Sequence, residues 1–276
     1  GAGKTPVTEV VRAHYTRRGL RAASLSRGYR GSLEGAHRVD PARHTFQEVG
    51  DEPLMLSASG ESWVSKDRPA GARAMKADGV QLIVMDDGHQ NPTLKKSLSI
   101  VVVDAGNPFG NGHVFPKGPL REPVAAGLAR ADAVVLMGDG EAPAAFSGFA
   151  GPILRARLAA TSTLAPGRYV AFAGIGRPSR FFDALGRQAG VELLEGAPYP
   201  DHHAFTQYDV SFLMKLAANH DARLVTTAVL FFLYLAIVMF KQDLSLQAGW
   251  YLCLAATPQG IKVGWSRPRH SRIRHA

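Results

Sequence analysis

The first residues of the chain form a pattern that could bind phosphate. The chain begins with Gly1, Ala2, Gly3, Lys4 and Thr5, and a helix-like stretch follows, as at the end of a phosphate-binding loop. Glycines let backbone N–H groups approach a phosphate, and the amino end of a helix adds a favourable dipole. Lys4 would reach the β- and γ-phosphates of a nucleotide, and the Thr5 hydroxyl would ligate Mg²⁺. An ordinary helix start is the alternative interpretation of so short a pattern.

Two carboxylates stand where a strand is expected to end. The apolar run 80–85 is followed directly by Asp86, Asp87 and Gly88. In a parallel sheet ligands bind at the carboxyl ends of strands, where an aspartate can hold Mg²⁺ or one of its waters. A solvated turn is the alternative, because Asp-Asp-Gly suits a turn. Together with the glycine–lysine–threonine pattern, the carboxylates favour a site for ATP or GTP.

Three further segments carry polar groups that nucleotide binding alone does not explain. Asp51 precedes a helix-like stretch, where it could merely cap the helix. Arg121 and Glu122 lie between prolines that fix their loop, and a salt-bridged surface loop is the alternative there. Asp201 is followed by two histidines, of which His202 is the nearer. A metal site is a poor interpretation of adjacent histidines, because they point to opposite sides of an extended segment. An Asp–His pair assisting proton transfer is more economical, and two ordinary loop histidines are the alternative.

Apolar runs typical of strands alternate with helix-like stretches along the chain. The expected strands are 22–25, 80–85, 98–103, 133–137, 169–173 and 223–226. The expected helices include 6–18, 68–77 and 180–189. Unbroken β-branched runs suit strands buried on both faces. We therefore predict an α/β fold of the P-loop NTPase type, with a mainly parallel sheet flanked by helices and a second, smaller α/β lobe.

The composition of the chain changes at two places. Residues 143–152 are rich in Pro and small residues, so we expect a linker there. This divides a nucleotide-binding and catalytic lobe over 1–150 from a second α/β lobe over 151–227, which carries the Asp-His-His motif. Residues 228–276 form an atypical tail, apolar and then basic. The uncharged run 224–240 is at the lower length limit for a membrane-spanning helix, and a buried strand or helix explains it equally well.

Composition excludes several classes of protein. The chain has 276 residues, of which 46% are hydrophobic, too many for a disordered protein. Its single cysteine excludes a disulfide scaffold and a multi-cysteine zinc site. The net charge of +9 would suit nucleic acid, but basic residues do not alternate with aromatic ones as in proteins that stack bases. We expect no nucleic-acid partner, since an anionic substrate or a membrane surface suits the charge equally well.

An ordered set of motifs resembles one family. The motifs are GAGKTP, SRGY at 26–29, VGDEP, DDGHQNP, VVVDAGNPFGNG, FPKGPLREP, FAGIGRP and YPDHHAF. Together they resemble the tetraacyldisaccharide 4′-kinase, or lipid A 4′-kinase, family over residues 1 to about 227. The resemblance implies phosphorylation of the 4′-hydroxyl of a tetraacyldisaccharide 1-phosphate by ATP and Mg²⁺. It also implies peripheral or anchored membrane contact at the cytoplasmic face of the bacterial inner membrane.

The resemblance also implies residue roles. The nucleotide set is Gly1, Ala2, Gly3, Lys4, Thr5, Arg121 and Glu122. The metal set is Thr5, Asp86 and Asp87. Asp51 matches the acid that takes the proton from the attacking hydroxyl, and Asp201 and His202 match the pair that supports it.

Two other functions remain as alternatives. One is another P-loop NTPase of the metal-insertion GTPase type, although the guanine-reading Asn-Lys-x-Asp motif of such proteins does not occur in the sequence. The other is an inactive, truncated product, because after Thr227 the chain departs from the Glu-Lys-Asp that the family pattern continues with.

Overall fold

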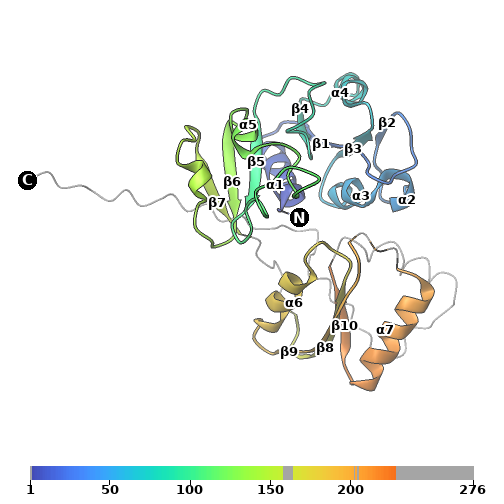
Figure 1. Ribbon diagram of the computed structural model, residues 1–276. Coiled ribbons are helices and arrows are strands. Elements are labelled where there is room, and N and C mark those ends of the chain that lie inside the picture. The colour runs from blue at the N-terminus through green and yellow to red at the C-terminus, as the bar shows by residue number, and fades with distance from the viewer. Residues whose placement is uncertain (1, 158–163, 202, 204, 228–276) are drawn as a thin grey trace, which may run out of the picture.

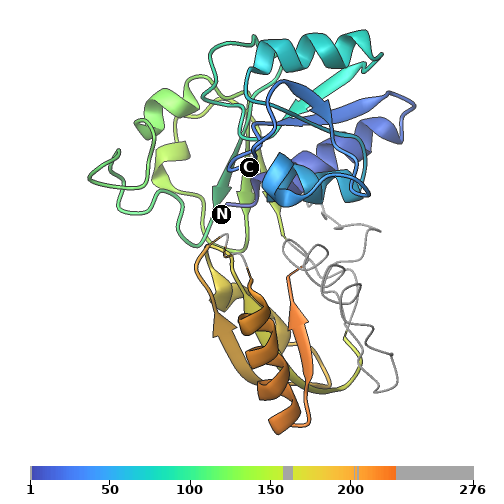
Figure 2. The ribbon, with the colours of Figure 1, turned by 90° about the vertical axis from the view of Figure 1, so that its right-hand side faces the viewer.

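The computed structural model describes residues 2–157, 164–201, 203 and 205–227, which form two lobes (Figures 1 and 2). Gly1, His202 and the tail expected over 228–276 lie outside the described residues. Within the described ranges, no helix is both long and apolar enough to cross a membrane.

The first sheet of the larger lobe has the order β2-β3-β1-β4. Its strands are β1 (Ala22–Ser26), β2 (Ala36–Arg38), β3 (Ser62–Ser65) and β4 (Leu82–Met85). β3, β1 and β4 are parallel, and β2 is an antiparallel edge strand. The helices on this sheet are α1 (Lys4–Thr16), α2 (Phe46–Val49), α3 (Asp51–Ala58) and α4 (Arg68–Ala77). Every residue of β1 and β3 is buried, as expected for parallel strands covered on both faces.

The second sheet of this lobe is parallel and has the order β5-β6-β7. Its strands are β5 (Ile100–Asp104), β6 (Ala133–Met137) and β7 (Ile153–Ala156), and the short helix α5 (Val124–Leu128) precedes β6. Val7 of α1 packs against the cluster that contains Val135 and Met137, while α1 also contacts β1 and β4. α1 therefore joins the two sheets (Figure 1).

The smaller lobe is a parallel sheet in the order β10-β8-β9. Its strands are β8 (Gly167–Ala173), β9 (Val191–Pro198) and β10 (Arg223–Thr226). Leu185 of α6 (Pro178–Gly186) packs with Tyr169, and Leu213 of α7 (Gln207–Asn219) packs with Phe172. Side chains alternate between the two faces of a strand, so Tyr169 and Phe172, three residues apart on β8, point to opposite faces. The two helices therefore cover opposite faces of the sheet.

The α/β class with parallel sheets and flanking helices is confirmed, but two details differ from the sequence-based expectation. The larger lobe has two sheets rather than one, with β4 and β5 at their facing edges. Residues 143–152 do not form a linker between lobes, because Phe146 in the 3₁₀ helix η1 (Ala144–Phe146) is buried against Val134. β7 then pairs with β6, so the larger lobe's sheet extends past residue 150.

A buried carboxylate connects the lobes. The Asp104 side chain, at the end of β5, is 5% exposed and contacts Arg177 and Arg180 at the start of α6. The Arg180 Nη2 to Asp104 Oδ1 distance is 2.7 Å, and the Gly106 N–H donates to the same oxygen at 3.0 Å. Burial alone would raise the pKa of Asp104, but these hydrogen bonds and positive charges outweigh it and lower the pKa below its usual value.

We predict that Asp104→Asn lowers the free energy of unfolding by about 1–2 kcal/mol at pH 7, because it removes the charge that both arginines bind. Because the folded pKa lies below the usual Asp value of about 3.9, the wild-type advantage is present above that value and is lost as the pH falls through the folded pKa. Denaturant titrations of both proteins at several pH values measure this. An unchanged difference below pH 4 would contradict it.

Candidate active site

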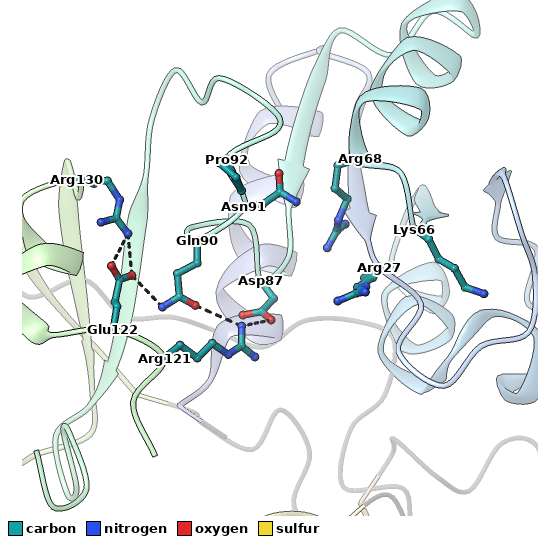
Figure 3. A pocket seen from close by; sticks show the side chains of 10 residues that line it. All are labelled: Arg27, Lys66, Arg68, Asp87, Gln90, Asn91, Pro92, Arg121, Glu122 and Arg130. Atoms are coloured by element: carbon teal, nitrogen blue, oxygen red, sulfur yellow. Dashed lines mark hydrogen bonds and ion pairs between the residues drawn. The ribbon is translucent and has the colours of Figure 1, made fainter. Parts of the chain in front are cut away.

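The carboxyl ends of β1, β3 and β4 open on a charged cavity of about 530 Å³ (Figure 3). Its lining combines basic side chains with two carboxylates. The basic residues are Arg27, Lys66, Arg68, Arg121 and Arg130, and the carboxylates are Asp87 and Glu122. Crevices at the carboxyl edge of a parallel sheet are the usual ligand sites of α/β proteins, so this cavity is the candidate active site.

Asp87 lies at the centre of this cavity and binds two cations (Figure 3). Its Oδ1 accepts from the Lys4 Nζ at 2.5 Å, and its Oδ2 accepts from the Arg121 Nη1 at 2.8 Å. Burial would raise the pKa of Asp87, but the hydrogen bonds and charges of Lys4 and Arg121 outweigh it and lower that pKa. The fold thus brings together three residues that the sequence analysis singled out in distant segments: Lys4, Asp87 and Arg121.

Asp86 is buried directly beneath, with 3% of its surface exposed. Its Oδ1 lies 3.4 Å from the Thr8 hydroxyl, and the Thr5 side chain also hydrogen-bonds to it. The Oδ2 atom is buried and has no hydrogen-bond partner among the described residues. Burial raises the pKa of Asp86 above its usual value, an effect that Thr5 and Lys4 only partly oppose.

Two glycines set the loops that carry Asp51 and Arg27. Gly28 follows Arg27 with a φ of 72°, and a Cβ there would lie 2.3 Å from Val64. Gly50 precedes α3 with a φ of 87°, and a Cβ there would lie 2.8 Å from the backbone oxygen of Tyr29. Only glycine fits either position, because any side chain would meet these neighbouring atoms. The absence of side chains lets the loop after β1 and the loop before α3 pack tightly against each other. Asp51 then begins α3, where its Oδ1 accepts from the Glu52 N–H at 3.0 Å.

Glu52 completes a cluster of acidic groups that the sequence analysis did not assign. Burial raises the pKa of the Glu52 carboxyl, and the charges of Asp86, Asp51 and Asp87 add to this, while Lys4 opposes it. Glu52 therefore lies close enough to three other carboxylates to be repelled by each of them. The only sequence signal was the place of Glu52 within the VGDEP motif.

Arg121 and Glu122 do not form a pair with each other. Both Glu122 carboxylate oxygens accept from the Arg130 Nη2 at 2.7 Å, and the Gln90 amide donates to the same carboxylate at 2.9 Å. Gln90 also accepts from Arg121 at 3.4 Å, so a continuous hydrogen-bonded chain runs from Asp87 to Arg130 (Figure 3). Glu122 thus anchors the loop from which Arg121 reaches the site.

In the smaller lobe, Asp201 is an exposed residue in a turn after β9. His203 packs against Tyr199 and Phe205, with ring centroids 4.8 and 4.9 Å away, and its Nε2 lies 3.2 Å from the Asp209 carboxylate. His203 therefore has a structural role. The roles expected for Asp201 and for His202, which lies outside the described residues, stay predictions.

A family model described as tetraacyldisaccharide-1-P 4′-kinase, LpxK, matches residues 1–251. The chain is 60% identical over 227 residues to the tetraacyldisaccharide 4′-kinase of Hyphomonas neptunium, covering 82% of this chain and 68% of that protein. It is 51% identical over 234 residues to the tetraacyldisaccharide 4′-kinase of Maricaulis maris, with the same coverage of both chains.

One solved structure has a similar fold. It is the crystal structure of LpxK from Aquifex aeolicus in complex with ATP, with a TM-score of 0.62 and 23% sequence identity. The similarity covers 83% of this chain and 74% of that one. At this level of identity the likeness concerns the fold alone.

We predict that Glu52→Gln raises the free energy of unfolding at pH 7, by about 0.5–1 kcal/mol, because it removes one of four neighbouring negative charges. The pKa of Glu52 is higher in the folded protein than in the unfolded chain. The ionised carboxylate therefore lowers the free energy of unfolding, and this loss develops as the pH rises from the pKa of the unfolded chain to that of the folded protein. The gain should therefore vanish near pH 4 in denaturant titrations. Destabilisation at pH 7 would show that the Glu52 carboxylate makes favourable contacts instead.

Proposed function

This chain belongs to the tetraacyldisaccharide-1-P 4′-kinase family, and we infer that it transfers the γ-phosphoryl group of ATP to the 4′-hydroxyl of a tetraacyldisaccharide 1-phosphate in lipid A biosynthesis. The observation that carries this inference beyond the family is the Lys4–Asp87–Arg121 arrangement at the amino end of α1. Two cations beside a carboxylate suit phosphoryl transfer, in which charge builds on the phosphoryl oxygens. The comparisons do not favour the metal-insertion GTPase alternative.

The start of α1 would hold the phosphates of ATP. Gly3 has a φ of 94°, and a Cβ there would lie 3.1 Å from the Met137 side chain, so the backbone turns sharply into the helix without a side chain. The amino-terminal N–H groups of a helix bind anions, and Lys4 and Arg121 add positive charge. Gly1, Ala2, Gly3, Lys4 and Thr5 remain the proposed ATP loop, with Arg121 and Glu122 beside it.

Thr5, Asp86 and Asp87 would hold Mg²⁺. The unpartnered, buried Asp86 Oδ2 fits a cation, since an isolated carboxylate oxygen is costly to bury. Within the described residues, no three side chains of His, Cys, Asp or Glu gather as a metal cluster. Magnesium in kinases is bound through one or two carboxylates plus substrate phosphates, and this donor set fits that mode. Bound Mg²⁺ would neutralise charge on the phosphates.

Asp51 is the proposed base. The 4′-oxygen forms a bond to the γ-phosphorus, the bond from that phosphorus to the β,γ-bridging oxygen breaks, and ADP leaves with the electron pair. The proton of the 4′-hydroxyl passes to the Asp51 carboxylate, which lies among the acidic residues at the amino end of α1. Asp201 and His202 would support this step from the second lobe.

The acceptor places the reaction at a membrane. A substrate with four acyl chains partitions into a bilayer because of its apolar surface. We therefore propose that the protein works at the cytoplasmic face of the bacterial inner membrane, through peripheral or anchored contact.

The function is tested by following label from γ-³²P-ATP into a tetraacyldisaccharide 1-phosphate with Mg²⁺. We expect wild type to label the lipid and Asp51→Asn to lower kcat by about 10²–10⁴-fold, because proton transfer to a base contributes that much. The variant should keep its affinity for ATP. Label released only as inorganic phosphate would favour an NTPase, and no transfer at all would favour the inactive product.

The metal site is tested by thermal unfolding. Mg²⁺ should add to the rise in Tm that ATP gives to wild type, because a ligand that binds only the folded state stabilises it. We expect Asp86→Asn to abolish the Mg²⁺-dependent part and keep the part due to ATP with EDTA. An equal Mg²⁺ increment in the variant would exclude Asp86 as a ligand.

A further inference from the structure

The loop 107–120, between β5 and α5, belongs to the larger lobe but has no part in the proposed phosphoryl transfer. Figure 2 shows it in green, standing out from the body of the lobe. At its base Phe109 packs edge to face against Phe146, with ring centroids 5.9 Å apart. None of residues 107–120 lines the cavity, although Arg121, directly after them, does. The loop is therefore free to have a function of its own.

The tip of this loop exposes an aromatic ring. Phe115 is 79% exposed, and among the residues that the structure describes only Tyr208 is a large apolar side chain exposed to the same extent. Pro116, directly after it, is exposed as well. Exposure alone decides little, since single apolar side chains are common on protein surfaces. The loop that carries Phe115 is what distinguishes it.

The backbone at the tip is hydrogen-bonded within the loop. The Phe115 N–H donates to the Leu120 oxygen at 2.8 Å, and the Leu120 N–H donates to the His113 oxygen at 3.1 Å. The Gly118 N–H donates to the Val114 oxygen at 3.2 Å, and Val114 and Leu120 form an isolated bridge. These bonds hold the ring of Phe115 outward on an ordered support.

Side chains and prolines complete this support. The Asn111 amide donates to the Lys117 oxygen at 2.9 Å, and its Oδ1 accepts from the His113 N–H at 3.2 Å. Pro116 and Pro119 have no N–H that would need a partner. An apolar medium disfavours backbone polar groups that lack a partner, so a tip built in this way can leave water at little cost.

The charge of the loop suits an anionic surface. Residues 105–121 contain no Asp or Glu, whereas His113, Lys117 and Arg121 lie among them. Lys117 is exposed and stands two residues from Phe115. An apolar side chain beside a lysine, with no carboxylate near in sequence, is the combination by which peripheral proteins bind anionic lipids.

A bilayer fits this tip better than a protein partner does. The tip projects, and its apolar surface comes from one ring and its neighbours, whereas a stable protein interface buries about 800 Å² on each partner. Arg121 comes six residues after Phe115, and an extended chain of that length spans at most about 20 Å. A bilayer at Phe115 therefore lies beside the cavity.

We propose that loop 107–120 docks on an anionic phospholipid bilayer, with the Phe115 ring at the boundary of acyl chains and headgroups and Lys117 among the headgroups. This inference rests on the proposed function, because an acceptor with four acyl chains reaches the cavity from the bilayer. Docking through this loop holds the cavity close to the leaflet that contains the acceptor.

The position of the tip is tested by fluorescence with Phe115→Trp. Vesicles of equal parts phosphatidylcholine and phosphatidylglycerol carry brominated acyl chains, which quench a tryptophan that reaches them. We expect the emission that Phe115→Trp adds to that of wild type to shift to the blue and to be quenched. Tyr208→Trp is the matched control, because Tyr208 is equally exposed but lies on α7 of the smaller lobe. Its added emission should stay unquenched.

The affinity is tested by sedimentation with the same vesicles, without bromine. Phe115→Ser should lower partitioning about tenfold or more, because the gain from burying a phenylalanine side chain is lost. Tyr208→Ser should partition as wild type does. Lys117→Gln should lower partitioning about fivefold on these vesicles and leave it unchanged on phosphatidylcholine alone, because only the first carry negative charge. Thermal melts check that each variant folds.

Several results would overturn the proposal: no quenching of Phe115→Trp, equal quenching of the two tryptophan variants, or unchanged partitioning of Phe115→Ser. The assay of label transfer keeps this inference apart from the proposed function. If wild type labels the acceptor while Phe115→Ser partitions as wild type does, only the docking of the loop is wrong. If wild type transfers no label although the Phe115→Trp emission is quenched, only the proposed function is wrong.

Discussion

The larger lobe is organised around carboxylates that must be held close together. Asp51, Glu52, Asp86 and Asp87 meet at the amino end of α1, and like charges at such distances are costly unless cations or protons offset them. Asp87 is offset by Lys4 and Arg121, whereas burial raises the pKa of Asp86 and Glu52. This arrangement requires the phosphate-binding loop, the end of β4 and the loop of Arg121 to occupy fixed places. Three features of the surrounding structure fix these places. α1 joins the two sheets, and Gly50 lets the Asp51 loop pack against the loop that follows β1. Glu122 anchors the loop of Arg121 through its bond to Arg130.

The topology explains why charges of both signs meet at one edge. Parallel strands deliver the residues that follow them to the same side of the sheet, and β3, β1 and β4 deliver Lys66, Arg27 and the two aspartates in that order. One edge thereby brings two carboxylates and two cations close together. Asp104 joins the second lobe to the end of β5, the matching edge of the other sheet. Both lobes thus meet near the carboxyl ends of strands.

Sequence alone predicted the elements with strong local signals. The limits of β6, β10 and α4 agree with the prediction, since β6 is an unbroken apolar run and α4 begins with an Asp67 cap and a proline. β3 was missed because two of its four residues are serines, which only the tertiary structure shows to be buried. β9 was missed because its apolar pattern is irregular, and its pairing with β8 shifts register at Tyr169 and Val170. The same limit applies to the site: motifs identified Lys4, Asp87 and Arg121, but Glu52, Arg27 and Lys66 depend on packing between loops distant in sequence.

The most direct test of this account is a crystal structure of the protein with Mg²⁺ and a non-hydrolysable ATP analogue. We predict that the phosphates lie at the amino end of α1 with Lys4 and Arg121 in contact, and that the metal binds Asp86 Oδ2. Nucleotide phosphates placed away from the start of α1, or a metal that does not contact Asp86, would contradict the central claim.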